Sequence, residues 1–388
     1  MGLGLGNILR GPTSVITPTF TVSTVYLNIG GEITEASNAI PDSWVTSEAF
    51  YASRVTFKST LTSIGVSAFA SCADITGSLK LPNSLVTIGN QAFSDCYGLN
   101  GVLKIPNSVT TIGSQAFYYC TGLTGLTIGS SVTSIGESAF FSCASLTGSL
   151  VIPDSVTSIG VSAFRLCGFF NSTLTIGNSV TSIGDNAFSS TNFTGSIAIP
   201  NSVTTIGSSA FKYCSNLNGT LTIGNSVTLI GDGAFKYCSY LTGSLTIPNS
   251  VTTIGPEAFF DNVGFTGSLV IGNSVTSIGY YAFEGCDGFT GSLTIPNSVT
   301  EIGINSFSGC SGFTGLLTIG NSITQIDDFA FQSCSGFTRI NINKLVAPTI
   351  GLGVFDGMTS VSPAVIHVPV GATGYAASYS GLTVVKDL

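Results

Sequence analysis

The chain has 388 residues, of which 43% are hydrophobic, 8% are charged and 48 are glycine; its 19 acidic and 11 basic residues give a net charge of −8. This hydrophobicity with so little charge argues against a disordered chain, and no basic stripe of the kind that nucleic-acid binding requires is present. No run of about 18 apolar residues occurs, so we expect no membrane insertion.

Residues 1–52 lie outside the repeat that fills most of the chain. Residues 14–29 are rich in β-branched residues and predict one or two strands, and Trp44 follows in a turn-like context. We interpret this segment either as a cap over the first coil or as an attachment to a larger assembly. The start lacks the features of a secretory signal, so export by a signal peptide is not expected if Met1 is native.

Residues 53–358 consist of a repeated unit of 23 to 24 residues, best seen at residues 245–262. A fixed period of this size predicts a solenoid, in which each coil buries its apolar face only against its neighbours. An isoleucine, most often in a Thr-Ile-Gly or Ser-Ile-Gly motif, marks each of 13 coils: Ile64, Ile88, Ile112, Ile135, Ile159, Ile183, Ile206, Ile230, Ile254, Ile278, Ile302, Ile326 and Ile350.

Each coil is predicted to have three parts. The first is a short strand of pattern Leu-x-Ile, as at residues 293–295, with its middle residue facing outward. The second is a turn that begins with Pro or Gly, followed by Asn-Ser and another extended piece with inward Val and Ile. The third, Ala-Phe-x-x-Cys, has the spacing of one helical face and predicts a single turn of α- or 3₁₀-helix.

From Pro153 to Gly320, proline and glycine alternate strictly at the start of the second part, as in Pro200, Gly224, Pro248 and Gly272. Either residue suits a turn, so we expect little physical difference between the two kinds of coil. The alternation indicates that the array grew by duplication of blocks of two coils.

All ten cysteines fall three residues after the phenylalanine of the third part, and Thr191, Asn262 and Met358 fill that position in other coils. Residues that can be replaced singly in this way are not obligate disulfide partners, and a spacing of one whole coil does not suit zinc. We therefore predict buried free thiols, with no bound metal or other cofactor.

Residues 359–388 depart from the repeat and predict a C-terminal cap with a strand at residues 366–370. The chain has one histidine, His367, in this strand, where a structural role is expected. No pair of acidic residues recurs at the spacing of a glycosidase site, and no phosphate-binding loop follows a strand. The sequence therefore predicts a protein that is not an enzyme.

Two outward-facing sets of residues are candidates for partner contact. Threonines recur two residues before the marker isoleucine, and they either support strand geometry or form a regular hydroxyl lattice for ice or a polysaccharide. The two positions after the phenylalanine vary between coils and are either ordinary exposed edges or a binding surface rich in Tyr and basic residues. Two further tyrosines directly precede the Ala-Phe at residues 282–283. The candidates are Tyr118, Tyr119, Arg165, Lys212, Tyr213, Lys236, Tyr237, Tyr280 and Tyr281.

The copies at residues 105–123 and 247–262 resemble the BspA-like class of leucine-rich repeats, and the resemblance covers roughly residues 55–358. It implies an α/β solenoid, a right-handed coil with parallel strand columns and short α- or 3₁₀-turns on the opposite side. It also implies adhesion, with protein or glycan binding on microbial surfaces and no catalysis.

Because a secretory signal and an anchor are not seen, our main hypothesis is a virion component such as a tail fibre, receptor-binding or decoration protein. Its partners would be a protein or glycan receptor on a cell surface and, through residues 1–52, other virion proteins. The first alternative is a microbial cell-surface adhesin. The second is a purely structural rod or an ice- or glycan-binding lattice.

Overall fold

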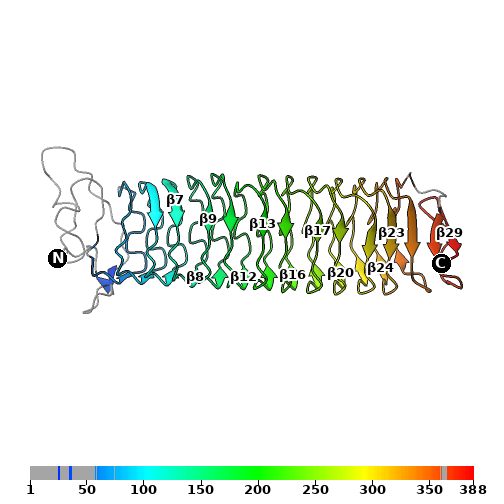
Figure 1. The fold of residues 1–388 in the computed structure, drawn as a ribbon, viewed down its shortest axis with the longest axis horizontal. Helices are drawn as coiled ribbons and strands as arrows, with labels where there is room; N and C mark the ends of the chain where they lie inside the picture. Colours follow the sequence, from blue (N-terminus) through cyan, green and yellow to red (C-terminus); the bar gives the residue numbers. More distant parts are fainter. Residues whose placement is uncertain are drawn as a thin grey trace. The chain divides into compact units, whose positions relative to one another are not determined.

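The computed structural model describes residues 25–26, 35–36, 57, 59–73, 75–358, 360 and 365–388. Of the N-terminal segment, only β1 (Val25–Tyr26) and β2 (Glu35–Ala36) are among them, and these two strands pair antiparallel. The choice between a cap and an attachment, and the environment of Trp44, lie outside the described residues. The chain forms two compact units, Met1–Phe193 and Thr194–Leu388, and each is a stretch of parallel β-solenoid (Figure 1).

One column of two-residue strands runs through each unit and contains the marker isoleucines. Equivalent residues pair in register, as where Ile159 of β10 lies between Ile135 and Ile183. In the first unit these strands are β3 (Ser63–Ile64), β4 (Thr87–Ile88), β6 (Thr111–Ile112), β8 (Ser134–Ile135), β10 (Ser158–Ile159) and β12 (Ser182–Ile183). In the second they are β14 (Thr205–Ile206), β16 (Leu229–Ile230), β18 (Thr253–Ile254), β20 (Ser277–Ile278), β22 (Glu301–Ile302), β24 (Gln325–Ile326) and β26 (Thr349–Ile350).

The predicted Leu-x-Ile strands form the other column, in which the first residue is buried and the second is mostly exposed. The first unit contains β5 (Gly101–Lys104), β7 (Leu123–Thr127), β9 (Leu150–Val151) and β11 (Leu174–Thr175). The second contains β13 (Ile197–Ala198), β15 (Leu221–Thr222), β17 (Leu245–Thr246), β19 (Leu269–Val270), β21 (Leu293–Ile295), β23 (Leu316–Ile319) and β25 (Arg339–Ile342). After β25 the ladder continues through β27 (Val365–Val368) and β29 (Leu382–Lys386), to which β28 (Ser378–Tyr379) pairs antiparallel.

The expected α- or 3₁₀-turn in the third part of each coil is wrong, because the described residues contain no helix. Alternate backbone N–H groups point to different partners: Phe93 donates to the carbonyl of Ala116 in the next coil, whereas Ser94 donates to the Gln91 carbonyl. Gln91 and Asp95 also have φ values of +56° and +60°, which no right-handed helix contains. Among these residues there is likewise no helix of the length and apolar character needed to cross a membrane.

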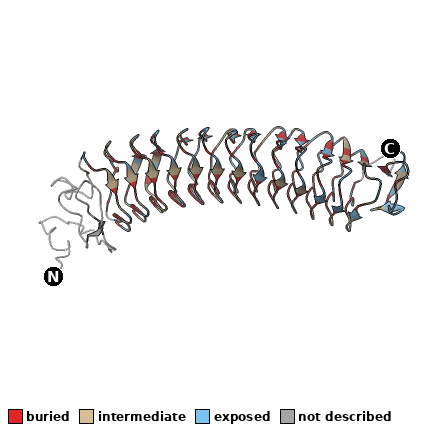
Figure 2. Ribbon diagram, turned by 90° about the horizontal axis from the view of Figure 1, so that it is seen from below, coloured by how far each residue is buried: buried red, intermediate tan, exposed pale blue. Residues whose placement is uncertain are grey.

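Stacked phenylalanines fill the core of the coils. Phe93 and Phe117, for example, are fully buried, with ring centroids 5.2 Å apart and planes inclined by 8°. A second buried stack follows the cysteine position in the second unit, where Phe265 and Phe289 lie 5.0 Å apart. Figure 2 shows buried residues recurring from coil to coil inside each unit. Each ring therefore finds its main contacts in adjacent coils, as expected for a solenoid.

All ten cysteines are buried free thiols, as predicted from their single column. The structure adds a reason for the residue type: the Cys96 thiol donates to the backbone carbonyl of Phe69 in the preceding coil, with an Sγ–O distance of 2.9 Å. Asn262 satisfies the equivalent carbonyl of Phe235 through its side-chain amide. In these coils the position holds a buried side chain that donates to this carbonyl, whereas Met358 is buried there without a donor group.

The alternation of proline and glycine has a steric cause, so the expectation of little physical difference was wrong. A Cβ atom on Gly272 would lie 2.3 Å from the carbonyl oxygen of Pro248 in the preceding coil. The coils also differ in their hydrogen bonds, because the Asn249 side chain accepts from the backbone of Asn273. From Pro106 onward, glycine in the coil after a proline coil leaves room for the proline carbonyl, whereas Pro82 and Pro106 occupy successive coils.

Candidate partner-binding surface

The two variable positions after the buried phenylalanine face outward in the structure. In the coil of Phe235, the N–H of Lys236 donates to Gly233 within the same turn, and the N–H of Tyr237 donates to the carbonyl of Phe260 in the next coil. The backbone is therefore fixed by hydrogen bonds while both side chains are free to differ. This arrangement presents two side chains per coil on a rigid scaffold.

Several tyrosines on this surface have a left-handed backbone. The φ values of Tyr119, Tyr213, Tyr237 and Tyr281 lie between +54° and +61°. Glycine occupies the position equivalent to Tyr237 in another coil, as Gly285. A bulky residue at positive φ is an outlier that costs roughly 1–2 kcal/mol. The scaffold therefore accepts glycine here, and the tyrosine side chains are present despite their backbone strain.

In the first unit, Tyr118, Tyr119, Phe141 and Arg165 form a cluster that we call the first ridge. The ring of Tyr118 stacks on Phe141 with centroids 5.0 Å apart and meets Tyr119 edge-on at 4.6 Å. The guanidinium carbon of Arg165 lies 5.8 Å from the centroid of the Phe141 ring. Three aromatic residues and a cation from three successive coils are thus brought together.

Two groups of the first ridge are partly withdrawn from water. Burial and, secondarily, the nearby phenol of Tyr119 raise the pKa of Tyr118 above its ordinary value. The Nε atom of Arg165 is buried, and within the described residues it has no hydrogen-bond partner. A buried donor of this kind costs free energy unless an acceptor reaches it.

In the second unit a longer cluster, the second ridge, comprises Lys212, Tyr213, Lys236, Tyr237, Phe260, Tyr280 and Tyr281. Tyr213 and Tyr237 stack with centroids 4.9 Å apart. Tyr237 then contacts Phe260 edge-on at 5.4 Å, and Phe260 lies 6.4 Å from Tyr281. The result is a continuous aromatic surface over four coils.

Charged groups flank the second ridge. The Nζ atom of Lys236 lies 4.5 Å from the Phe260 ring centroid and forms an ion pair of 2.6 Å with Glu257. Burial and then the charge of Glu257 raise the pKa of Glu284, whereas Lys236 acts in the opposite direction. The Oε2 atom of Glu284 is buried with no hydrogen-bond partner among the described residues. One orphaned polar atom thus lies in the first ridge and one beside the second.

All nine candidate residues predicted from the sequence fall into these two ridges. The list of candidates left out Phe141 and Phe260, although each is the second phenylalanine of an Ala-Phe-Phe sequence and occupies the same variable position as Tyr118. It also missed the acidic flank of the second ridge, Glu257 and Glu284. Comparing the variable position in every coil, aromatic residues included, would have found both phenylalanines.

The threonine column has a clear structural role. The hydroxyl of Thr252 donates to the backbone carbonyl of Thr228, and that of Thr276 donates to Thr252. The same bond recurs in both units, for example from Thr181 to Thr157. These hydroxyl hydrogens are used between coils, which leaves fewer donors for a regular lattice of outside contacts.

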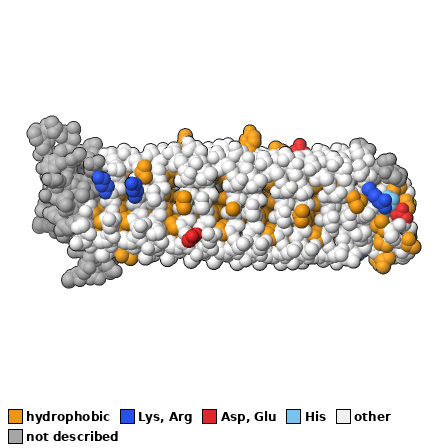
Figure 3. Space-filling model, in the orientation of Figure 1, with side chains coloured by type: hydrophobic (Ala, Val, Ile, Leu, Met, Phe, Trp, Pro, Cys, Tyr) orange, Lys and Arg blue, Asp and Glu red, His pale blue; other side chains and the backbone are white. Residues whose placement is uncertain are grey.

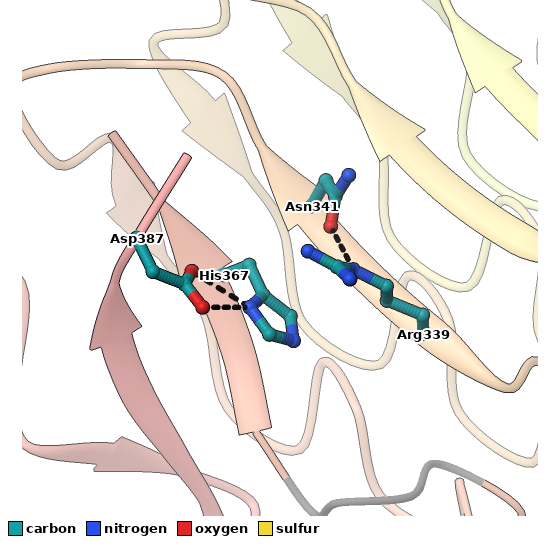
Figure 4. Close-up of polar contacts among 4 residues, drawn as sticks. All are labelled: Arg339, Asn341, His367 and Asp387. Carbon is teal, nitrogen blue, oxygen red and sulfur yellow. Dashed lines mark hydrogen bonds and ion pairs between the residues drawn. The ribbon is translucent and has the colours of Figure 1, made fainter. Parts of the chain in front are cut away.

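His367 pairs with Asp387 near the C-terminus (Figure 4). Its Nδ1 atom lies 2.7 and 2.9 Å from the two carboxylate oxygens, so the residue after β29 is tied to β27. On the neighbouring strand β25, Arg339 donates to Asn341. Neither His367 nor Asp387 hydrogen-bonds to a hydroxyl or thiol in the described part of the chain. Across those residues, no group of three His, Cys, Asp or Glu side chains is placed to hold a metal.

Comparison with known proteins gives one family and several structural relatives. The model of the BspA type leucine rich repeat region matches residues 43–171, 146–266 and 260–377. A leucine rich cell surface protein from Faecalibacterium prausnitzii is 28% identical, with a TM-score of 0.51 over 94% of this chain and 96% of that chain. A leucine-rich repeat protein from Bacteroides ovatus shares the fold, with 24% identity, a TM-score of 0.51 and coverage of 91% and 95%. No curated protein matches.

These matches favour the alternative of a microbial surface protein. They offer no support for the virion hypothesis, which rested on the apparent lack of a secretory signal and anchor. They do not bear on the individual residues of either ridge.

Proposed function

The chain belongs to the BspA-type leucine-rich repeat family, and we propose that it is a non-catalytic microbial cell-surface protein that binds a protein partner through its aromatic ridges. Surface display is supported by the likeness to the cell surface protein of Faecalibacterium prausnitzii. Binding by the ridges is supported by their residue types, since Tyr and Arg dominate the contacts that carry affinity between proteins.

The observation that carries this proposal is the continuous series of aromatic contacts on the outside of the second unit, from Tyr213 through Tyr237 and Phe260 to Tyr281. Tyr213 and Tyr237 have φ values of +61°, and the equivalent position has a positive φ in other coils too, where serine, aspartate, leucine or glycine fills it. The scaffold therefore sets this conformation, and it holds the tyrosine side chains in fixed positions despite a cost in backbone strain. Since Tyr213 is 48% exposed, its side chain contributes little to the core that would offset the strain.

The geometry of the rings favours a protein over a sugar. Tyr213 and Tyr237 stack on one another, and Lys212 and Lys236 lie over the same two rings. Ring edges and phenol hydroxyls thus remain for a partner, rather than open faces on which a sugar ring could lie. The orphaned Arg165 Nε and Glu284 Oε2 atoms would gain partners of both signs, which the mixed surface of a protein supplies.

The binding proposal is tested with the purified full chain on a panel of extracellular-matrix and epithelial surface proteins by biolayer interferometry. The triple variant Tyr213→Ala/Tyr237→Ala/Tyr281→Ala should weaken binding to any hit by at least about tenfold, because truncation of aromatic anchors typically costs 2 kcal/mol or more. Antibody labelling of intact native cells tests surface display separately.

Tyr240→Ala is the matched control, because Tyr240 is 62% exposed in the same unit and belongs to neither ridge. Its affinity should equal that of the wild type. Equal affinity of the triple variant and the wild type would refute binding by the second ridge. Absence of labelling on intact cells would refute surface display whatever the binding result.

A further inference from the structure

A groove of about 570 Å³ lies on the Leu-x-Ile face of the second unit. None of the residues that line it belongs to the second ridge. Its floor contains Thr246, Val270 and Thr294, the outward residues of β17, β19 and β21. Val270 is 50% exposed, so an apolar patch lies between two hydroxyl-bearing residues. This volume is within the range of ligand-binding clefts.

The lining of the groove contains no charged residue. Along one side run serines such as Ser268 and Ser292, and along the other run asparagines. Charged side chains are also sparse on the face shown in Figure 3. A charged ligand would lose hydration here without gaining a counter-charge, so the groove favours an uncharged one.

The asparagines of the glycine coils present unused amide groups. The side chains of Asn225 and Asn273 are exposed and make no hydrogen bond within the described residues, whereas the oxygen of Asn249 between them accepts from the backbone of Asn273. Asn225 and Asn273 are two coils apart, which is about 9.5 Å at the spacing of paired strands. The groove therefore repeats the same free donor and acceptor pair at every second coil.

We propose that this groove is a second binding site, for one extended strand of a neutral polysaccharide. Sugar hydroxyls both donate and accept hydrogen bonds, and so do the amides of Asn225 and Asn273 and the hydroxyls of the walls. Val270 would face the C–H surface of a sugar ring. In an extended chain whose sugars alternate in orientation, the repeat is a disaccharide, whose length is comparable to the two-coil spacing.

The backbone of the groove disfavours an extended peptide as the occupant. The N–H groups of Leu245 and Ile247 donate to the carbonyls of Ser268 and Val270 in the next coil, so the strands below the groove are already paired. A peptide lying across them would find no sheet edge for its own N–H and C=O groups. A polysaccharide has no such backbone requirement.

Affinity gel electrophoresis of the full chain tests the site directly. Gels contain a neutral polymer (hydroxyethylcellulose, xylan or galactomannan), a charged one (polygalacturonate or heparin) or none. We expect retardation by at least one neutral polymer and by neither charged one. The variant Asn225→Ala/Asn273→Ala should bind about tenfold more weakly through the loss of two hydrogen-bonding groups. Val270→Lys should abolish binding, and the fold already accommodates lysine at this strand position in Lys80 and Lys104.

Asn178→Ala is the matched control, since Asn178 is the exposed asparagine of a glycine coil in the first unit and does not line the groove. It should bind as the wild type does, and so should Tyr237→Ala in the second ridge. The proposal is overturned by retardation in no neutral polymer, by equal retardation in charged polymers, or by equal binding of the double variant. A loss of binding in Asn178→Ala as large as in the double variant would overturn it as well.

Discussion

Each coil places a buried phenylalanine directly beside an exposed pair of residues, and the two regions obey different rules. Phe235 is fully buried and stacks on Phe211 and Phe259, 5.2 and 5.4 Å away. Tyr237, two residues later, also stacks on its equivalent in an adjacent coil, but on the surface. The core stack recurs from coil to coil with one residue type, whereas the surface stack changes from coil to coil.

The difference shows how a repeat separates stability from recognition. In the core column, every ring is a contact for the coils on both sides, so a change at one position affects its neighbours. On the ridges, backbone hydrogen bonds to the next coil hold the chain in place whatever the side chain is. Substituting Phe235, Lys236 and Tyr237 one at a time therefore measures how much the core and the ridge each contribute to the free energy of unfolding.

The largest expected effect is in the core. Phe235→Ala should lower the free energy of unfolding by about 3–5 kcal/mol, because it leaves a cavity between two stacked rings. Urea unfolding followed by circular dichroism measures it. Tyr237→Ala is the surface control and should lower the free energy of unfolding by less than about 1.5 kcal/mol. This figure is the upper end of what an aromatic pair contributes in addition to the burial of its surface. Similar costs for both variants would contradict the division between core and ridge.

A smaller effect is expected from the cysteine column at alkaline pH. Burial raises the pKa of the Cys120 thiol from 9.0 to about 12, so in the folded state the group stays neutral when the unfolded chain has begun to ionise. The contribution of this thiol to stability is complete below pH 9 and is lost as pH rises toward 12. The stability difference between wild type and Cys120→Ala should narrow by about 1.4 kcal/mol for each pH unit above 9. Unfolding in urea at a series of pH values measures this difference, and a constant one would contradict the assignment.

Much of the fold could be predicted from the sequence because the repeat makes one coil's pattern visible many times. The strand at Ile254, the strand at Leu245 and the buried thiol column follow from alternation and spacing alone. The helical turn could not be predicted correctly, because Ala-Phe-x-x-Cys has helical spacing whether or not its N–H groups bond within the turn. Their bonds to the next coil depend on the stacking of coils, which local spacing does not encode.

The residues of the candidate site could be predicted from the sequence, but their arrangement in space could not. Variation after the phenylalanine indicated Tyr213 and Tyr237, but nothing in the sequence gives the φ values of these residues or the stacking of their rings. The groove around Val270 was not predicted, because its polar residues are the same turn residues that every coil contains. Which asparagines have free amides depends on the steric alternation of Pro248 and Gly272, which only the stacked coils show.

The smallest effect tests the backbone strain of the ridge. At Tyr237, with φ at +61°, Tyr237→Gly should be more stable than Tyr237→Ala by about 1 kcal/mol, because only glycine adopts this conformation without strain. At the preceding Lys236, whose φ is not positive, the order should reverse, with Lys236→Ala more stable by about 0.5–1 kcal/mol. Both pairs are compared by urea unfolding. If glycine were the less stable residue at both positions, the backbone at Tyr237 would be unstrained.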